Sequence, residues 1–321
     1  MRKRRLFLGL TSLFVALLAI EGLVRLRQWQ RYGTTLPTYY RFVDDPESGL
    51  RIPEPLSSVG PIQVNSLGFR GGEVEQPKPP ARVRVAFLGG STTFCAEASS
   101  FASTWPELVL AGLRADAPGL EFDAVNCGAG GFTTAESRIN LERRVAPLQP
   151  DVIVYYEATN DLTRDARKAA IAVDLYEPRE SDHGRLGDWW LTYFLVEKNL
   201  RQFLDSRGGA ERKLHVAPRE LSRGFEERLS GLLTSAKQHA PVVAIATFAV
   251  RMRPEQTSEV QRAAAASALF YMPFLDVPDL LAGYAEYNRV IRAVARALDV
   301  ILIEDETAIP GDREHFADSV H

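Results

Sequence analysis

From residue 81 onward, short apolar runs alternate with amphipathic stretches. This pattern predicts a parallel sheet with helices packed on both faces. The apolar runs predict strands at residues 83–88, 122–125, 152–156, 242–247 and 300–303. The stretches with helical spacing predict helices at residues 105–113, 135–145, 225–239 and 284–298. We therefore expect an α/β domain over residues 81–321, a three-layer α/β/α fold with a mainly parallel, flavodoxin-like sheet.

Two segments break this alternation and are interpreted as insertions. The first covers residues 163–215 and contains Trp189, Trp190 and further aromatic residues. It predicts a lid or wall over a site, and the alternatives are a helix packed on the body and a segment lying at a membrane surface. The second insertion covers residues 251–280 and includes the alanine-rich piece 263–266.

The N-terminus combines a basic cluster with an apolar run. Arginine and lysine fill positions 2–5, and an uncharged stretch follows from Leu6 to Ile20. A helix from Leu6 to Val24 would span roughly 28 Å, close to the thickness of a bilayer's hydrocarbon core. We assign residues 1–27 to a cytoplasmic basic tip and a transmembrane signal anchor, which places the rest of the chain outside the cytoplasm, in the periplasm. The alternative is a cleaved signal peptide, although no small-x-small cleavage site follows the apolar run.

Residues 28–80 are polar and rich in proline, so they predict a stalk and lead-in to the domain. Within them, the peptide 64–71 places turn residues on both sides of Phe69. We expect this phenylalanine to be buried.

Composition and charge narrow the classes of function. Hydrophobic residues make up 45% of the 321-residue chain and charged residues 25%, which is ordinary for a globular protein. The net charge is -3, and because residues 1–27 carry +5, the rest of the chain carries -8. This balance gives no signature of nucleic-acid binding, and it argues against a polyanionic substrate.

Four short peptides carry groups suited to ester hydrolysis. Ser91 follows the first predicted strand and a glycine pair, so its hydroxyl can project as a nucleophile and its N–H can face an oxyanion. Gly131 and Asn160 follow the second and third strands and offer a backbone N–H and an amide NH₂. Asp318 and His321 are three residues apart, so the carboxylate can orient the imidazole as general base. The first three groups should meet at the carboxyl edge of the sheet.

Each peptide alone also has a purely structural interpretation. Ser91 could be a helix N-cap, Asn160 a turn residue, and the Asp318–His321 pair part of a solvated tail. The peptide Asp312-Arg313-Glu314-His315 repeats the Asp-x-x-His spacing, which makes His315 an alternative base. Spacing alone does not choose between the two histidines.

Taken together, the peptides resemble the four blocks of the SGNH/GDSL hydrolases, a family of serine esterases and acyl hydrolases, in its membrane-anchored bacterial form. The resemblance covers roughly residue 64 to the end. Gly89-Gly90-Ser91 resembles the Gly-Asp-Ser block with Gly90 in place of Asp. The peptide 158–161 resembles the Gly-x-Asn-Asp block with Ala158 in place of Gly.

Gly130-Gly131-Phe132-Thr133 resembles the family's oxyanion glycine block, and Asp318-Ser319-Val320-His321 resembles its Asp-x-x-His block. The resemblance implies Ser91 as nucleophile, Ser91, Gly131 and Asn160 as oxyanion donors, and no metal or other cofactor. It favours His321 over His315, because similar sequences place an aromatic residue and an aspartate just upstream. Family members continue past this histidine into a final helix, so we expect a perturbed or mispaired imidazole at His321 and an apolar sheet surface left exposed.

The two cysteines, Cys95 and Cys127, each lie four residues from a site residue, Ser91 and Gly131 respectively. We expect two small thiols near the rim of the site, and the alternative is a disulfide in an oxidising compartment. Neither these cysteines nor the five scattered histidines have metal-ligand spacing.

The leading hypothesis is an anchored serine esterase that removes O-acyl groups, such as acetyl, through an acyl-serine intermediate. Its substrate would be an acylated small molecule or an envelope glycan, with no nucleic acid involved. One alternative is an O-acyltransferase that passes the acyl group to a glycan hydroxyl from the same site. The other is an inactive glycan-binding or scaffold protein.

Overall fold

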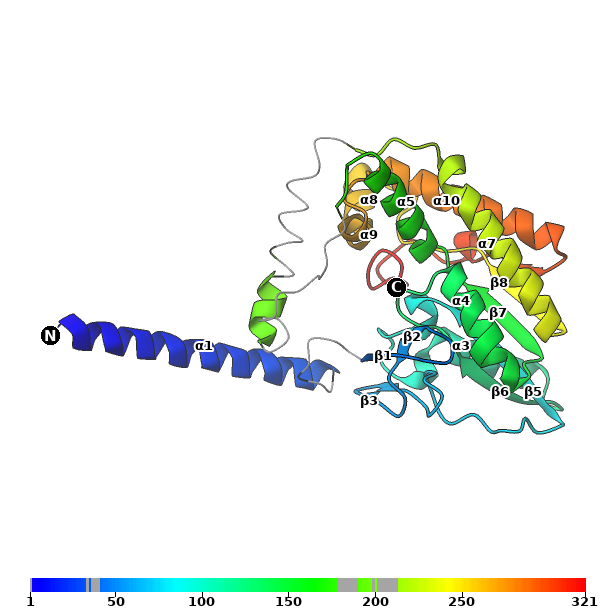
Figure 1. Cartoon of the computed structure of the whole chain (residues 1–321), viewed down its shortest axis with the longest axis horizontal. Helices are drawn as coiled ribbons and strands as arrows, with labels where there is room; N and C mark the ends of the chain where they lie inside the picture. The colour runs from blue at the N-terminus through cyan, green and yellow to red at the C-terminus, as the bar shows by residue number, and fades with distance from the viewer. Residues whose placement is uncertain (1, 33–34, 36–40, 178–189, 198–199, 201–212) are drawn as a thin grey trace.

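A computed structural model describes residues 2–32, 35, 41–177, 190–197, 200 and 213–321. At its centre is a parallel sheet in the order β6-β5-β7-β8-β9 (Figure 1). Its strands are β5 (Arg82–Gly89), β6 (Glu121–Asn126), β7 (Val152–Tyr156), β8 (Val242–Ala246) and β9 (Ile301–Ile303). Numbered along the chain, this order is 2-1-3-4-5, which is the flavodoxin-like arrangement. The predicted fold is confirmed, and the strand order reverses between β5 and β7.

Helices follow every strand of this sheet. They are α2 (Ser91–Phe94) and α3 (Trp105–Asp116) after β5, α4 (Thr134–Asn140) after β6, α5 (Thr159–Ala172) after β7, α7 (Pro218–His239) before β8, α8 (Ser258–Ala264), α9 (Ala266–Tyr271) and α10 (Val277–Ala297) after β8, and α11 (Asp305–Ala308) after β9. Both α7 and α10 begin about two turns earlier than predicted, each with proline in its first turn. Proline fits there because a first-turn N–H has no intrahelical acceptor.

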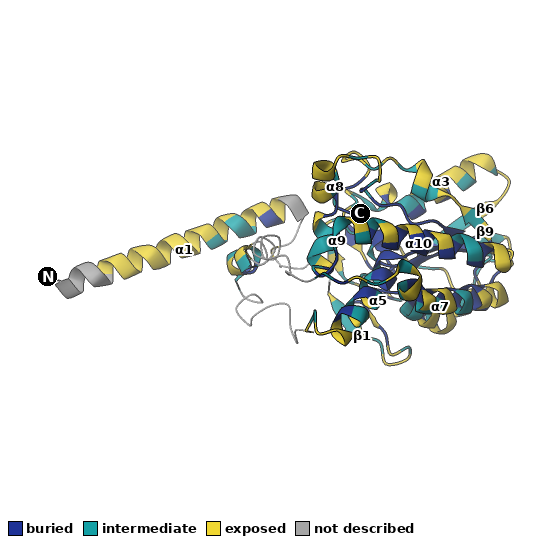
Figure 2. Cartoon of the chain, turned by 90° about the horizontal axis from the view of Figure 1, so that it is seen from above, coloured by how far each residue is buried: buried dark blue, intermediate teal, exposed yellow. Residues whose placement is uncertain are grey.

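The two faces of the sheet are covered by different helices. Along β5, Val85 and Phe87 point to the face that Leu110 of α3 covers. Ala86 and Leu88 point to the opposite face, where α5, α7 and α10 contribute to a larger core. Figure 2 shows α7 and α10 with buried residues on one side and exposed residues on the other. At the outer strand β9, Ile301 and Ile303 remain 56% and 40% exposed.

The lead-in is folded rather than stalk-like where the structure describes it. It forms two hairpins, β1 (Phe42–Asp44) with β2 (Arg51–Pro53) and β3 (Ser58–Val59) with β4 (Ile62–Gln63). Ile52 packs in one cluster with Phe132, and Ile62 packs in another with Phe94 of α2. Phe69 is buried, as predicted. The lead-in therefore supports the two loops that follow β5 and β6.

The first predicted insertion begins later than expected. Residues 163–172 belong to α5, whose charged outer side chains conceal an apolar stripe made of Leu162, Ala166 and Ala170. Trp189 lies outside the described residues, and residues 191–197 are helical. The second predicted insertion, 251–280, contains α8 and α9 as an addition between β8 and α10.

The helical segment 191–197 contacts α1 (Arg2–Tyr32). The backbone N–H groups of Leu191 and Thr192 donate to the two carboxylate oxygens of Glu21, at 2.9 and 2.8 Å. Glu21 also accepts a hydrogen bond from Arg25 Nε at 2.6 Å. These bonds attach the aromatic segment to α1, so it is not a helix packed on the α/β body.

The helix α1 extends away from the α/β body (Figure 1), and most of its described side chains are exposed (Figure 2). Residues Leu8–Gln30 form one candidate membrane span, found among the described residues by length and apolar composition. A signal sequence meets the same criteria. α1 is thus an apolar N-terminal helix of the kind that serves as an anchor or a signal sequence.

Candidate active site

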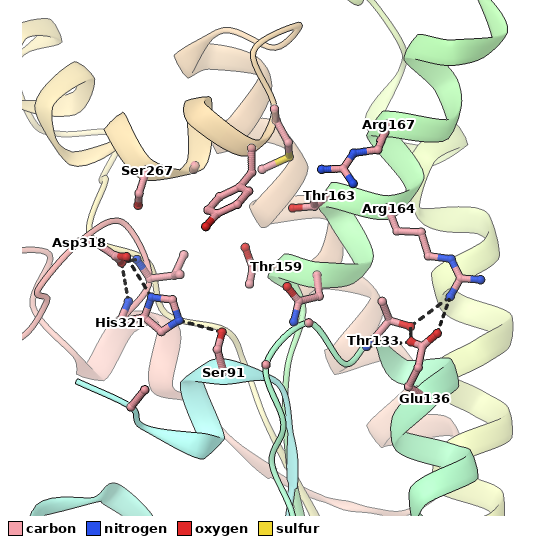
Figure 3. Close-up of a pocket in the computed structure, with 18 of the residues that line it drawn as sticks. Ser91, Thr133, Glu136, Thr159, Thr163, Arg164, Arg167, Ser267, Asp318 and His321 are labelled. Atoms are coloured by element: carbon pink, nitrogen blue, oxygen red, sulfur yellow. Dashed lines mark hydrogen bonds and ion pairs between the residues drawn. The ribbon is translucent and has the colours of Figure 1, made fainter. Parts of the chain in front are cut away.

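Ser91 is the first residue of α2, directly after the carboxyl end of β5. The N-cap of α2 is Gly90, so the serine hydroxyl is not used to cap the helix. Instead, Ser91 Oγ lies 2.8 Å from His321 Nε2 (Figure 3). Asn126 at the end of β6 donates from Nδ2 to the carbonyl of Thr93 at 2.8 Å and holds α2 against the sheet. The interpretation of Ser91 as a simple helix cap is therefore wrong.

Asp318 and His321 form the pair that their spacing predicts. His321 Nδ1 lies 3.0 Å from Asp318 Oδ2, while Asp318 Oδ1 accepts the N–H groups of Val320 and His321 at 2.8 and 2.9 Å. With Nδ1–H donating to the carboxylate, Nε2 is left to accept the proton of the Ser91 hydroxyl. The expected mispairing of the imidazole does not occur.

A buried serine holds this turn against the second insertion. Ser319 is 1% exposed, and its Oγ accepts the N–H of Ala268 at 3.2 Å. Its own N–H donates to Ser267 Oγ at 3.0 Å, and its carbonyl accepts the N–H of Arg251 at 2.9 Å. Three hydrogen bonds thus fix the turn between the loop after β8 and helix α9.

The electrostatics of the pair suit a base at neutral pH. Burial would lower the pKa of His321, but the hydrogen bond to Asp318 and the charges of Glu97 and Asp318 outweigh burial and raise that pKa above its usual value. Burial would raise the pKa of Asp318, but its hydrogen bonds with the ring of His321 and with two backbone N–H groups keep that pKa below its usual value. Asp318 is therefore ionised and stabilises a protonated imidazole.

The alternative histidine makes the same pairing elsewhere. His315 Nδ1 lies 2.8 Å from Asp312 Oδ1, with its side chain 42% exposed. It does not line the cavity that contains Ser91. Tertiary structure thus separates two Asp-x-x-His motifs that spacing leaves equal.

Gly131 and Asn160 both line the cavity beside Ser91. Gly131 has φ +81°, a left-handed conformation that favours glycine. Asn160 donates from Nδ2 to the carbonyl of Phe132 at 2.9 Å, which leaves the second N–H of this NH₂ group available to another acceptor. The next residue, Asp161, accepts the N–H of Thr134 at 2.7 Å, and this bond joins the start of α5 to the glycine loop.

Glu157 is a site residue that the sequence analysis did not identify. It follows β7, is 1% exposed, and accepts the N–H of Asn160 at 2.7 Å through Oε1. Its Oε2 is buried and has no hydrogen-bond partner among the described residues. A Cβ at position 90 would overlap this oxygen and Asn160 Nδ2. The carboxyl group of Glu157 thus fills the space beside Gly90, and the glycine in place of aspartate was the available signal.

Burial raises the pKa of Glu157 to about 8, although the N–H of Asn160 and the nearby His321 act in the opposite direction. The carboxyl group is therefore protonated at neutral pH. A protonated Glu157 carries no charge, so the ionised carboxylate that acts on His321 is that of Asp318, which is hydrogen-bonded to the ring.

Arg70 is a second residue that the sequence analysis missed. It is 2% exposed, and its Nη1 donates to the carbonyl groups of Phe94 and Cys95 at the end of α2. A cation at a helix C-terminus is favourable, so Arg70 stabilises the short helix that begins with Ser91. Its position in the turn peptide after Phe69 carries no recognisable motif.

These residues open into a cavity of about 840 Å³ between the sheet edge, α5 and α9 (Figure 3). Ser91 and His321 lie at one end of the region drawn, and Thr163 and Arg167 of α5 line another part. The second insertion contributes Ser267 and Tyr271 to the cavity wall.

Both cysteines are free thiols, as expected. Burial raises the pKa of Cys95 to about 11 and that of Cys127 still further. Such thiols are poor nucleophiles at neutral pH. Among the described residues, no cluster of three or more His, Cys, Asp or Glu side chains could hold a metal ion.

A model of the GDSL-like Lipase/Acylhydrolase family matches residues 87–321, which contain all four peptides of the site. The chain belongs to this family. It is accordingly an ester-bond hydrolase of the SGNH/GDSL type, and this agrees with the hydrogen-bonded Ser91 and His321. A search of curated proteins found no match.

Two solved structures are similar to part of this chain. Axe2, an acetylxylan esterase from Geobacillus stearothermophilus, is 17% identical, with 68% of this chain and 74% of that chain covered and a TM-score of 0.38. An alpha/beta hydrolase enzyme from the metagenome of Lake Arreo, Spain, is 16% identical, with 73% and 82% covered and a TM-score of 0.42.

Proposed function

We propose that Ser91, His321 and Asp318 hydrolyse an O-acyl ester through an acyl-serine intermediate. The observation that carries this proposal is the continuous hydrogen-bonded path from Ser91 Oγ to His321 Nε2 and from His321 Nδ1 to Asp318, at 2.8 and 3.0 Å. The path joins residues 230 positions apart in the chain.

In the first half-reaction, Ser91 Oγ attacks the carbonyl carbon while His321 Nε2 takes the serine proton. The tetrahedral intermediate collapses as the bond to the alcohol oxygen breaks, and His321 returns the proton to the leaving alcohol. In the second, water attacks the acyl-serine, His321 takes a proton from the water, and the acid leaves as Ser91 regains its hydrogen. Asp318 remains ionised and stabilises the imidazolium in both steps.

The oxyanion of each tetrahedral intermediate needs donors already in position. We assign this role to the N–H groups of Ser91 and Gly131 and to the NH₂ of Asn160. Three observations support the assignment. Gly131 has a left-handed backbone conformation, Asn160 donates a hydrogen bond to the carbonyl of Phe132, and Asp161 accepts one from the N–H of Thr134. They hold the three donors on loops that follow adjacent strands.

The substrate that the cavity supports best is an acylated carbohydrate carrying a short acyl group such as acetyl. The wall offers the hydroxyl groups of Thr159, Thr163 and Ser267, which can exchange hydrogen bonds with sugar hydroxyls. Tyr271 adds an aromatic side chain that is 56% exposed, and an aromatic face suits packing against a sugar ring. The cavity volume lies in the upper part of the range for small-molecule sites.

We further propose that α1 remains attached as a single-pass anchor with the hydrolase domain in the periplasm. Glu21 supports this because it accepts hydrogen bonds from Leu191 and Thr192, so a later segment of the chain contacts α1. A segment removed by cleavage has no need of such contacts. We also propose a division into an anchor at 1–27, a lead-in at 28–80 and a hydrolase domain at 81–321, although α1 continues to Tyr32; the packing of Ile52 and Ile62 supports a lead-in that lies on the domain. Protease protection in sealed vesicles, together with the mass of the mature protein, tests both orientation and cleavage.

The direct test of the reaction is p-nitrophenyl acetate hydrolysis by the full-length protein in detergent. Ser91→Ala and His321→Ala should each lower kcat by at least about 10³-fold, because the three residues act as one unit. His315→Ala is the matched control, and it should retain the parent rate. Asn160→Ala should lower kcat by about 10²-fold or more, as expected for an oxyanion donor. Retention of activity in Ser91→Ala, or its loss in His315→Ala, would contradict the assignment.

The same assay distinguishes hydrolysis from transfer. Addition of a glycan acceptor should leave acetate as the main product if water is the natural acceptor. Accumulation of acetylated glycan with suppressed acetate release would instead support the transferase alternative.

A further inference from the structure

The helix that carries Asn160 extends the site along one basic face. Residues 160, 163, 164, 167, 168 and 171 of α5 all line the cavity, and their spacing is that of a single helical stripe. Three of them, Arg164, Arg167 and Lys168, are basic. At about 1.5 Å per residue, Arg167 lies roughly 10 Å along the helix from Asn160. The stripe therefore starts at the proposed oxyanion donor and continues into a positively charged wall.

Arg164 is already neutralised within the protein. Its Nη1 lies 3.6 Å from Glu136 and donates to Thr133 Oγ1 at 3.1 Å. Figure 3 shows its guanidinium turned toward these two residues. Arg164 therefore helps to organise the start of α4 and is not available to a ligand.

Arg167 and Lys168 differ from Arg164 in having no carboxylate partner in the described part of the chain. The Arg167 guanidinium packs over the ring of Tyr176 at 5.3 Å, and its Nε is buried without a hydrogen-bond acceptor among the described residues. Figure 3 shows the guanidinium reaching from α5 into the cavity. A guanidinium that lines a cavity and has no carboxylate partner among the described residues can form charge-assisted hydrogen bonds with an anionic ligand there.

The carboxylates that line the same cavity are placed elsewhere. Asp318 is bonded to His321, and Glu136 is bonded to Thr133 and paired with Arg164. Glu97 contributes to the field at His321, near the serine. Apart from Glu136, which is paired with Arg164, the carboxylates of the cavity thus lie near the reacting groups. Arg167 and Lys168, which have no carboxylate partner among the described residues, make the α5 side of the cavity positive.

We propose that the substrate is an acylated glycan that carries an anionic group, a carboxylate or a phosphate, about 10 Å from the ester along α5, where Arg167 and Lys168 bind it. This inference rests on the proposed esterase function and adds the charge of its substrate. It differs from the expectation drawn from net charge, because Arg167 and Lys168 line the cavity although residues 28–321 carry -8 overall. A local pair of unpaired cations decides which ligand the cavity accepts.

The test compares kcat/KM of the full-length protein on three sets of acetylated oligosaccharides: uronic-acid, phosphate-bearing and neutral xylose chains. At least one anionic set should exceed the neutral set by about tenfold at low salt, and the preference should shrink as sodium chloride is raised. The set that is preferred identifies carboxylate or phosphate as the group bound.

Substitutions assign the preference to α5. Arg167→Gln and Lys168→Gln should each reduce the ratio of anionic to neutral kcat/KM by about threefold through KM, and Arg167→Lys should reduce it less because the charge remains. The matched control is Arg143→Gln, which removes one positive charge from an exposed position outside the cavity and should leave the ratio unchanged. A purely structural role for Arg167 would lower activity on all substrates alike.

Three outcomes would overturn the proposal. Equal kcat/KM on neutral and anionic glycans, with Ser91-dependent p-nitrophenyl acetate hydrolysis intact, would remove this inference and leave the esterase function standing. Absence of p-nitrophenyl acetate hydrolysis would remove both. Release of acyl groups from anionic phospholipid vesicles in preference to every glycan would show that the basic wall binds a lipid headgroup.

Discussion

Replacing Glu157 with a side chain that does not titrate tests whether the buried carboxyl group beside Gly90 is protonated in the folded protein. Glu157→Gln keeps the size of the side chain and an oxygen that can accept the N–H of Asn160, but it removes the titrating proton. The pKa of about 8 in the folded state and the usual value of 4.5 lie about 3.5 pH units apart, which corresponds to about 5 kcal/mol when both states are fully ionised.

The direction of the effect follows from which state holds the proton. Between pH 4.5 and 8, the folded protein keeps the Glu157 proton while the unfolded chain has lost it. The free energy of unfolding must then fall as pH rises through this window. Between pH 5 and pH 8, Glu157 alone should cost the parent protein about 3 kcal/mol of stability. Glu157→Gln should lack this loss.

The assay is urea unfolding of the full-length protein in detergent at pH 5 and pH 8, followed by near-ultraviolet circular dichroism. The quantity compared is the change in unfolding free energy between the two pH values, because this difference cancels groups common to both proteins. Glu227→Gln, an exposed position on α7, is the control and should behave like the parent. If Glu157→Gln and the parent lose stability equally within about 1 kcal/mol, the carboxyl group is ionised when folded and the reasoning is wrong.

Three further predictions concern the rest of the site. The raised pKa of His321 means that kcat/KM should increase with pH around a midpoint above about 6.5, and Asp318→Asn should lower both this midpoint and kcat in a pH–rate profile, since it removes the bond that raises the pKa. Ser319→Ala should lower the unfolding free energy by about 1–3 kcal/mol, because the N–H of Ala268 loses its acceptor. The value of kcat should also fall, and an unchanged kcat would show that this bond does not position His321. Gly90→Asp restores the residue typical of the family, and it should be inactive or unfolded because the new side chain overlaps Glu157. Adding Glu157→Gly should restore activity and melting temperature, which a double-mutant cycle measures.

Much of the architecture could be predicted because it depends on local patterns. The apolar runs at 83–88 and 152–156 are buried strands because a parallel sheet covered on both faces admits few polar side chains. Strand–helix alternation then predicts the layer order, and the positions of Ser91 and Asn160 directly after strands predict the sheet edge where they meet. The prediction failed for α5, whose residues 163–172 were assigned to the first insertion, because small alanines form its buried stripe between charged neighbours.

The choice of base and the neighbour of the nucleophile were decided by contacts between distant segments. Asp312–His315 and Asp318–His321 have the same spacing, but only the second is held by Ser319 against α9 and faces Ser91. The carboxyl group of Glu157 occupies the space left by Gly90, although 67 positions separate the two residues.

The sequence by itself thus determined the residue types of the site and the strand ends that carry them, because both follow from short-range periodicity. Only the tertiary structure decided which histidine reaches Ser91, which carboxyl group is buried beside it, and which cations of α5 are left unpaired. Those outcomes depend on packing and desolvation. Both result from many contacts between residues distant in sequence, which a local sequence pattern does not predict.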